Sequence, residues 1–561
     1  MRNRLFLAGF LLFLGSCLLF LSCTRTPPSS LQTGLLAYLK LTGNSHDESS
    51  YKRESRINGN PVFENSEPDS EGSLKFNGKD QWLEIPSDKS LSLGTGDFSI
   101  SLWVHTNDSV NDVLGDLVSR YDRKLRRGFR LGFMENSVTT SHANARQLTF
   151  GIDDNKASGW VDCGRPGNAL IAFGMANYKG KLYAGTCEPG LGESGRVYRY
   201  EGDKKWTDCG NPDSSNAVIG MAVYDGDLYV GTGKYRVAGS SLPESENTTP
   251  GGSIFRYEAD HRWTHCGQLP GAVSAAGMVV FRKELYASSL YSPGFFRYNK
   301  KTNTWVDCGT PDDDGNKRVI SFAVYNDYLY ATCYDTGKVY RYNGKTWTDC
   351  GLVGDNTQTY SFTVYEGQLY VATWPSGRVY RFEGIGNWAD VGRLGNELEV
   401  MGMLVHNGRF LGGTLPLAEV YSYEGDTTWR RIDQIDRTPD VKYRRAWTMA
   451  EHDGRVFCTT LPSGHIYAYE AGKSVMWEEP VLPGWRHITA IKKGNHLELY
   501  LDGKLIGKSG TFDAKAYDLA SSQPLQIGFG PTDYFRGKMK ELRIYDRALT
   551  AAEIKYLSEE Q

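Results

Sequence analysis

A tryptophan followed by a nearly constant phrase recurs through the middle of this chain of 561 residues. The copies are WVDCG from Trp160, WTDCG from Trp206, WTHCG from Trp263, WVDCG from Trp305 and WTDCG from Trp347, followed by the weaker WADVG from Trp388 and WRRID from Trp429. Successive tryptophans lie 46, 57, 42, 42, 41 and 41 residues apart. A repeat of this length indicates one supersecondary unit used several times, each copy burying its apolar face against the next.

Each unit has the pattern of four short strands. The segments GMAVYDGDLYVGT and GSIFRYEADHRW of one unit alternate apolar and polar residues at period two. Turn pairs that tolerate positive φ separate the first two strands: Asp225-Gly226, Glu366-Gly367, Asn407-Gly408 and Asp453-Gly454. Four antiparallel strands per unit at this period predict the blades of a β-propeller. We expect seven blades; six or eight remain possible if a weak copy is misjudged.

The first tryptophan fragment, residues 160–164, precedes any complete unit. It is therefore expected to supply the outer strand of the last blade and so to close the ring, with the segment around Trp477 as the competing candidate.

Residues 34–153 and 480–561, on either side of the repeats, have a different pattern. Both alternate as strands do, as in ISLWV from Ile100, yet neither alone could close a sandwich. The propeller, residues 154–479, is therefore expected to be inserted in a loop of one split sandwich, since surface loops accept inserted domains. A helix is expected only at the tail, where Thr550 can cap an apolar face.

Both flanks carry the phrases of a known family: SLKFNGKDQWLEIP, DFSISLWV, LELYLDGKLIG and the terminal RIYDRALTAAEI. Over nearly all of their length they resemble a laminin-G-like domain of the concanavalin A-like jelly-roll superfamily. The expected fold is thus all-β, a laminin-G-like sandwich with an inserted seven-bladed propeller. The resemblance implies that the sandwich could bind Ca²⁺ or a glycan, with Asp97, Asp502 and Asp546 at matching polar positions that also suit turns and caps.

The repeats resemble the kelch and sialidase class of propellers. They lack the paired glycines of kelch repeats, and Tyr340 and Tyr342 stand where a sialidase Asp-box would have Ser and Asp. This departure argues against sialidase chemistry.

The N-terminus is typical of an export signal. A positive start and apolar residues 5–21 precede Cys23 and a polar, Pro-rich stretch. The segment resembles a bacterial lipoprotein signal, which implies a leader over residues 1–23, lipidation at Cys23 and a linker over residues 24–33. Cys17 is an alternative acceptor, and an uncleaved anchor or an ordinary secretory peptide is the other interpretation. We expect an exported, membrane-anchored protein in the periplasm or at the cell surface.

Charge and metal-ligand patterns exclude several function classes. Lys and Arg (63) nearly balance Asp and Glu (66), and no basic stripe stands out, which argues against nucleic acid as a partner. The histidines show no zinc-like spacing. We therefore expect no transition metal and no cofactor apart from Ca²⁺ in the sandwich.

Eight cysteines lie in the repeats, and two interpretations remain open for them. An exported protein can form disulfides, here 187–209, 333–350 and 163–458. Second and fourth strands of a blade are separated by a third, however, which places them farther apart than a disulfide spans. Buried thiols that pack as small apolar residues are the favoured interpretation.

Loops that follow the second strands place aromatic side chains at similar positions in successive blades. The candidate binding residues are Tyr235, Tyr291, Tyr334, Asp335 and Trp374 in these loops, with Arg444 and Arg445 in a strand-connecting loop that could face the propeller axis. Aromatic rings with nearby polar groups at a propeller mouth suit stacking on sugars, although the same rings could merely pack one loop against another. A long loop, residues 236–252, is expected to be flexible and to cover this mouth.

The predicted function is recognition of a glycan or a cell-surface protein through propeller and lectin-like surfaces. The alternative is a glycan-active enzyme, a glycosidase or lyase, with its site on the propeller axis. No catalytic residue can be assigned, because paired carboxylates meet only in space. A structural scaffold in a surface assembly is the remaining interpretation.

Overall fold

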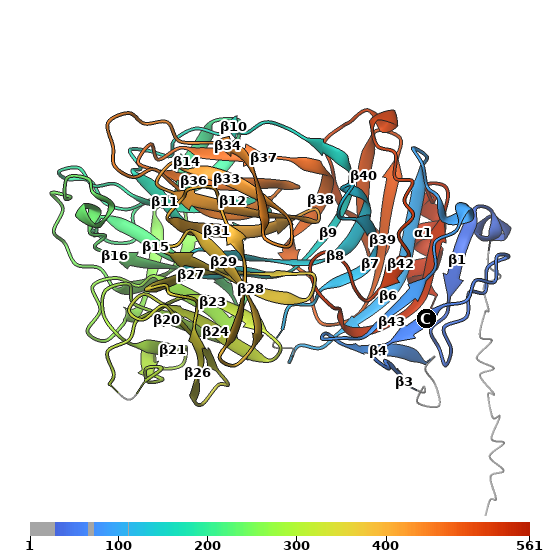
Figure 1. The fold of residues 1–561 in the computed structure, drawn as a ribbon, viewed down its shortest axis with the longest axis horizontal. Coiled ribbons are helices and arrows are strands. Elements are labelled where there is room, and N and C mark those ends of the chain that lie inside the picture. The colour runs from blue at the N-terminus through green and yellow to red at the C-terminus, as the bar shows by residue number, and fades with distance from the viewer. Residues whose placement is uncertain (1–27, 65–71, 110–111, 313, 561) are drawn as a thin grey trace, which may run out of the picture.

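The computed structural model describes residues 28–64, 72–109, 112–312 and 314–560. Within these ranges the fold is all-β, with one α-helix, α1 (Ala551–Glu559), and four short 3-10 helices: η1 (Ser29–Gln32), η2 (Lys89–Leu91), η3 (Val237–Ser240) and η4 (Ala514–Ala516). Figure 1 shows strands from both ends of the chain, blue and red, gathered on one side, and the strands of the repeats, green to orange, on the other.

The strands of the two flanks form two facing sheets. The first sheet contains β3 (Val62–Glu64), β4 (Ser73–Asn77), β43 (Arg536–Tyr545), β6 (Phe98–Thr106), β39 (Gly484–Lys493), β40 (His496–Leu501) and β41 (Lys504–Lys508) in this order, with β1 (Leu35–Leu39) on β43. The second contains β2 (Arg56–Asn58), β5 (Trp82–Ile85), β42 (Leu525–Ile527), β7 (Asp116–Asp122), β8 (Arg127–Val138) and β9 (Ser141–Ala157), with β38 (Ala471–Pro480) on β9. Because β6 pairs with both β39 and β43, the two halves rejoin in one sandwich.

Inward-facing apolar residues of both halves fill this sandwich. Phe98, Ile100 and Leu102 alternate along β6 and pack in one cluster with Ile488 and Ile544 from the C-terminal half. The alternation that predicted strands in each flank is therefore the alternation that builds the common core. The predicted helix is also confirmed: Thr550 and Glu553 form a capping box at the start of α1.

The repeats form propeller-like sheets of four antiparallel strands. In chain order their strands are β11 (Ile171–Tyr178), β12 (Lys181–Cys187), β13 (Val197–Gly202), β14 (Lys205–Asp208); β15 (Ala217–Tyr224), β16 (Asp227–Gly233), β17 (Ser253–Ala259), β18 (Arg262–Gln268); β19 (Gly277–Phe281), β20 (Glu284–Ser288), β21 (Phe295–Asn299), β22 (Thr304–Asp307); β23 (Val319–Tyr325), β24 (Tyr328–Cys333), β25 (Lys338–Tyr342), β26 (Trp347–Leu352); β27 (Gln358–Tyr365), β28 (Gln368–Trp374), β29 (Arg378–Gly384), β30 (Asn387–Arg393); β31 (Glu399–His406), β32 (Arg409–Leu415), β33 (Glu419–Gly425), β34 (Thr428–Gln434); β35 (Arg445–His452), β36 (Arg455–Leu461), β37 (Ile466–Tyr469).

Four of these sheets stand alone, and the other strands of the repeats are joined into larger sheets. β11–β14 and β15–β18 are linked by the single pair Cys187 and Ala217, and β19–β22 join the second sandwich sheet through Met278 and Ser141. The first tryptophan fragment forms β10 (Val161–Asp162), which pairs with β37 as expected.

The recurrent phrase joins neighbouring units. The indole N–H of a tryptophan donates to the backbone carbonyl of the preceding unit's cysteine: Trp206 to Cys163 at 2.9 Å, and Trp388 to Cys350 at 2.9 Å. Within the phrase, the aspartate side chain accepts from the glycine N–H two residues on, as Asp349 does from Gly351 at 2.7 Å. The phrase is thus a structural element that fixes one unit on the next.

The turn predicted at Asp225-Gly226 is present in the structure. Asp225 and Gly226 have φ of 52° and 79°, values that favour the Asx-Gly turn found there.

All eight cysteines of the repeats are free thiols, seven of them buried, and Cys308 is partly exposed. Packing of small apolar thiols is therefore the interpretation that holds, and the alternative disulfide pairs do not form.

A hairpin of the sandwich fills the centre of the repeats, which the sequence did not predict. The first strands of successive units contact one another in order, from β11 to β35 and back to β11, and β8 or β9 contacts each of them. At the hairpin tip, Thr139 donates from Oγ1 to the Trp447 carbonyl at 2.5 Å and from its N–H to Thr448 Oγ1 at 3.0 Å. Ser141 Oγ accepts from the Met221 N–H at 3.1 Å. The channel between the first strands is therefore occupied by the protein's own chain.

Buried polar contacts join the sandwich to the repeats. The Arg409 guanidinium binds the Asp153 carboxylate through Nε at 3.0 Å and Nη2 at 2.8 Å, and both side chains are almost fully buried. Burial raises the pKa of Asp153 to about 6, against the lowering effect of Arg409. In addition, β9 and β38 run from one body into the other as a paired ribbon, from Thr149 and Met476 to Ala157 and Ala471. The two bodies are thus connected by backbone pairing as well as by side chains.

Candidate functional site

The two ends of the first strands have different surroundings. The turns that follow them face the sandwich: Glu366 and Gly367 donate from their N–H groups to Pro531 and Thr532 carbonyls at 3.0 and 3.1 Å. The opposite ends, where the first strands begin, therefore lie away from the sandwich. We call this end the mouth, defined by Tyr235, Ser240, Tyr334, Tyr360, Glu399, Arg445 and Trp447.

The loop of residues 236–252 covers the mouth. Its 3-10 helix η3 ends at Ser240, whose hydroxyl lies 2.6 Å from the Tyr235 hydroxyl and accepts from Arg445 Nη1 at 2.7 Å. The predicted cover is therefore in place, fixed by a serine hydroxyl between a tyrosine and an arginine.

A carboxylate and a guanidinium lie beneath this loop. Glu399 and Arg445 are 3% and 8% exposed, and Glu399 Oε1 is 3.7 Å from Arg445 Nε, beyond hydrogen-bond distance. Neither atom has a hydrogen-bond partner in the described part of the chain, and the same holds for Tyr334 Oη and Trp447 Nε1. Buried polar atoms are normally paired, so this group is unusual.

Burial dominates the acid–base properties of the mouth. It raises the pKa of Glu399 to about 7, although the Arg445 charge acts in the opposite direction. Burial also holds the pKa of Tyr334 and of Tyr360 well above the ordinary value. At neutral pH the site therefore contains neutral tyrosines and a carboxyl group close to its own titration point.

Three of the residues predicted from the sequence meet in the mouth: Tyr235, Tyr334 and Arg445. Tyr235 packs edge-on against Phe173 at 4.7 Å between ring centroids, and Tyr334 lies 4.8 Å from Tyr360. The rings lie on one another rather than open to solvent.

The other predicted residues lie around the mouth. Tyr291 accepts from the Arg236 N–H at 3.0 Å, and Trp374 is partly buried against the same apolar cluster. The Asp335 carboxylate is bound by Arg318, whose Nε donates to Asp335 Oδ1 at 3.0 Å. Arg444 turns away to its own loop, donating from Nε to the Thr438 carbonyl at 2.6 Å.

Glu399, Tyr360 and Trp447 were missed from the sequence. Each is the first or third residue of a first strand, so it lies on the face that alternation directs toward the channel. The alternation of residues along each first strand therefore indicates which side chains share a face. It does not indicate which end of the strand forms the mouth.

The polar positions of the sandwich have structural roles. Asp97 Oδ1 accepts from the Gly494 N–H at 2.7 Å, and Asp502 Oδ1 from the His487 N–H at 2.9 Å. Asp546 donates from its N–H to the Gly34 carbonyl at 2.9 Å.

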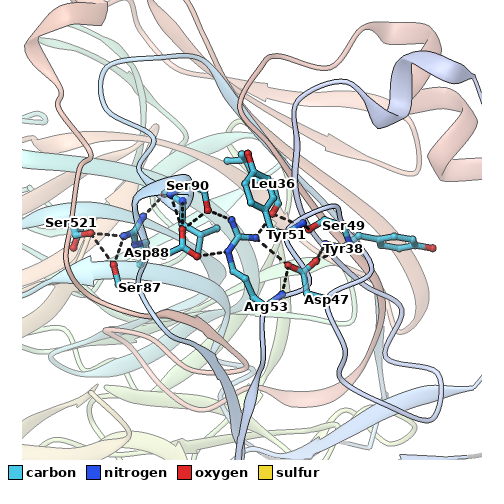
Figure 2. A network of polar contacts seen from close by, with 12 residues as sticks. Leu36, Tyr38, Asp47, Ser49, Tyr51, Arg53, Ser87, Asp88, Ser90 and Ser521 are labelled. Carbon is cyan, nitrogen blue, oxygen red and sulfur yellow. Dashed lines mark hydrogen bonds and ion pairs between the residues drawn. The ribbon is translucent and has the colours of Figure 1, made fainter.

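Figure 2 shows a polar network of the sandwich that includes Arg53. Its guanidinium donates to Asp88 at 2.6 Å, to Asp47 at 3.1 Å, and to Ser90 and the Leu36 carbonyl. Arg53 thereby pairs with both carboxylates and ties β1 to η2, which makes this network a structural one, unlike the mouth.

The described ranges contain no group of three or more His, Cys, Asp or Glu side chains placed to hold a metal ion. In the same residues, none of the helices has the length and apolarity needed to cross a membrane. The predicted leader and Cys23 lie outside the described residues.

The chain carries a concanavalin A-like domain. The family model described as the concanavalin A-like lectin/glucanases superfamily, a laminin-G model, matches residues 427–555. The match begins within the repeats and ends in α1, so it covers the C-terminal half of the split sandwich. No curated protein matches the chain by sequence.

Solved structures resemble the repeats at low identity. YCF48 from Cyanidioschyzon merolae is 10% identical with a TM-score of 0.41, and covers 56% of this chain and 99% of its own. Virginiamycin B lyase from Staphylococcus aureus is 10% identical with a TM-score of 0.42, over 56% and 99%. The GH74 xyloglucanase from Xanthomonas campestris is 14% identical with a TM-score of 0.38, over 67% and 63%. Similarities at these scores do not indicate a function for this chain.

Proposed function

We propose that this protein is an exported recognition protein that binds a carbohydrate, or a sugar-like group on a cell-surface protein, at the mouth of its repeats. The observation that carries the proposal is the convergence of four buried polar atoms that make no hydrogen bond, Tyr334 Oη, Glu399 Oε1, Arg445 Nε and Trp447 Nε1, among aromatic rings. A buried polar atom without a hydrogen bond destabilises the folded protein unless a ligand or a water molecule bonds to it.

The chemistry of the mouth suits hydroxyl groups. The Ser240 hydroxyl already lies between Tyr235 and Arg445, so a hydroxyl of a ligand can take the same two contacts when the loop moves aside. The same movement of the loop would open the packed Tyr and Trp rings to the carbon side of a sugar, with hydrogen bonds from their polar edges.

We further propose that the repeats form a seven-bladed ring of the kelch and sialidase class. The closed order of contacts among the first strands, from β11 to β35 and back to β11, supports the count. The pairing of β10 with β37, which adds a fourth strand to the last unit, supports the closure.

Export and lipid anchoring at Cys23 are part of the proposal. They rest on the N-terminal sequence alone, with its apolar stretch followed by cysteine. Membrane contact would then be through the lipid only, and the ligand would be a glycan or protein outside the cytoplasm.

The test is a glycan array probed with the purified protein, followed by titration of any hit against Tyr334→Phe. Removing the Tyr334 hydroxyl should weaken binding about fivefold or more, because one buried hydrogen bond is lost. Tyr51→Phe, at an exposed tyrosine of the sandwich, is the matched control and should bind as the parent does. An array without hits, or equal affinities for both variants, would contradict the proposal.

A glycan-active enzyme is the second candidate, and Glu399 favours it. A buried carboxyl group with a pKa raised to about 7 can act as a general acid near neutral pH. Hydrolysis or elimination of an array hit that is lost in Glu399→Gln, while binding persists, would establish this function over simple recognition.

A further inference from the structure

A second place on the molecule has the properties of a ligand site. It is a groove of about 560 Å³ where the turn between β7 and β8, the segment around β42 and the turn between β27 and β28 come together. We call it the seam groove and define it by Arg123, Leu125, Glu366, Gln523, Gln526 and Phe529. Its volume falls within the roughly 300–1,000 Å³ typical of ligand pockets.

Both bodies of the protein contribute to the seam groove. Glu366 comes from the repeats, and its backbone N–H is held by the Pro531 carbonyl of the sandwich at 3.0 Å. Across the groove, its Oε2 accepts from Arg123 Nη1 at 2.9 Å. The groove therefore exists only where the inserted repeats meet the sandwich, and its wall is fixed by backbone as well as side-chain contacts.

The lining has a mixed but nearly balanced chemistry. Arg123 and Glu366 neutralise one another, Lys124 and Asp122 add one charge of each sign, and two planar amides, Gln523 and Gln526, lie nearby on the sandwich side. Gln523 Nε2 donates to Asp122 Oδ2 at 3.0 Å, which fixes its orientation. Amide, guanidinium and carboxylate groups offer both donors and acceptors, which suits the neighbouring hydroxyls of a sugar.

Apolar surface lies beside these polar groups. Leu125 is 56% exposed, and Phe529 stacks on Tyr534 with ring centroids 4.2 Å apart. Trp82 packs against both rings at 5.7 Å, so the Phe529 ring is held in place. A rigid ring beside planar polar groups is suited to the apolar face of a sugar.

We propose that the seam groove binds a neutral oligosaccharide between the sandwich and the turn between β27 and β28. The paired charges make a neutral ligand a better match than an acidic or basic one, because a charged ligand would have to compete with the ion pair. The site is separate from the mouth and does not depend on it.

Calorimetric titration of the whole protein with cellotetraose, xylotetraose and mannotetraose, and with tetragalacturonate as an acidic probe, tests the proposal. At least one neutral tetrasaccharide should bind more tightly than tetragalacturonate. Gln526→Ala should raise its Kd at least fivefold, and Glu366→Gln severalfold, because each removes groups that face the ligand. Gln268→Ala, at an exposed glutamine on β18, is the matched control and should leave the Kd unchanged.

Melting curves confirm that each variant is folded before titration. Failure of all neutral probes, tighter binding of tetragalacturonate, or unchanged affinity in both Gln526→Ala and Glu366→Gln would overturn the proposal. Loss of binding in Tyr334→Phe with the two groove variants unaffected would overturn it as well, and would assign the ligand to the mouth instead.

Discussion

At the scale of single residues, the ionisable groups of this protein fall into two kinds. Arg409 and Asp153 are buried and hydrogen-bonded to one another, whereas Glu399 and Arg445 form a buried ion pair at 3.7 Å whose facing atoms make no hydrogen bond among the described residues. The first arrangement stabilises the join between two bodies. The second leaves interaction capacity for a ligand, and its electrostatics can be measured in the free protein.

Glu399→Gln should change how stability depends on pH. Because burial raises the pKa of Glu399 from 4.5 to about 7 in the folded state, the parent binds an extra proton when folded and loses stability as pH rises through this window. Glu399→Gln lacks this loss, so the two proteins should have similar free energies of unfolding near pH 4.5. By pH 8 the free energy of unfolding of the variant should exceed that of the parent by up to roughly 3 kcal/mol. Denaturant unfolding at several pH values measures this; parallel pH profiles would contradict it.

Arg409→Met should destabilise the protein strongly, because it leaves Asp153 buried without its partner. The expected cost is about 3–5 kcal/mol. The control is Arg378→Met, which removes an exposed pair with Asp390 and should cost about 1 kcal/mol or less. Restoring most of the loss by adding Asp153→Asn would confirm the cause, whereas equal effects of Arg409→Met and Arg378→Met would refute it.

At the scale of elements, the recurrent phrase explains how the units join. Its tryptophan donates to the preceding unit and its aspartate closes the local turn. The phrase therefore recurs in the units because it packs one unit on the next, and not because its residues form a binding or catalytic site. Trp160 and Trp347 break the rule, because their indole nitrogens have no hydrogen-bond partner within the described ranges. Trp347, in a complete unit, provides a built-in comparison.

Trp388→Phe and Trp347→Phe should therefore differ in stability. Both lose similar apolar area, but only Trp388→Phe removes a hydrogen bond, to the Cys350 carbonyl. We expect Trp388→Phe to be less stable by about 1 kcal/mol or more. Urea unfolding of the two variants gives the difference directly, and a larger loss in Trp347→Phe would show that the indole hydrogen bond is unimportant.

The strands, turns and tail helix could be predicted from the sequence, and the channel filling could not. Residues 127–157 show ordinary alternation, and nothing in it distinguishes a hairpin that ends in solvent from one whose tip reaches Trp447. The mouth was predicted from its aromatic loops, which identified Tyr235 and Tyr334, and from a strand-connecting loop that could face the axis, which identified Arg445. Glu399 was missed because a lone glutamate at a strand start has no local pattern, and its neighbours come from other units.

At the scale of the whole molecule, insertion and interlocking make the two bodies interdependent. The β8–β9 hairpin belongs to the sandwich by its base and to the repeats by its tip, and the seam groove needs both bodies. Among the described residues, the β8–β9 hairpin occupies the channel between the first strands, and the mouth is the end of the repeats that lies away from the sandwich.

Thermal unfolding should therefore proceed as one cooperative transition, since neither body keeps its contacts when the other unfolds. Scanning calorimetry should give a calorimetric enthalpy equal to the van't Hoff enthalpy. Two resolved transitions, with the repeats melting apart from the sandwich, would contradict this coupling.

Thiol labelling at the hairpin tip tests the central claim, that the sandwich threads the ring of first strands. Thr140, which is 1% exposed, is changed to cysteine in a Cys308→Ser background, and Val161→Cys, at a position 58% exposed, serves as the accessible control. A maleimide should modify Val161→Cys at once but Thr140→Cys only after unfolding. Labelling of folded Thr140→Cys at the rate of the control would show that the hairpin tip lies in solvent and that the ring is not filled by the sandwich.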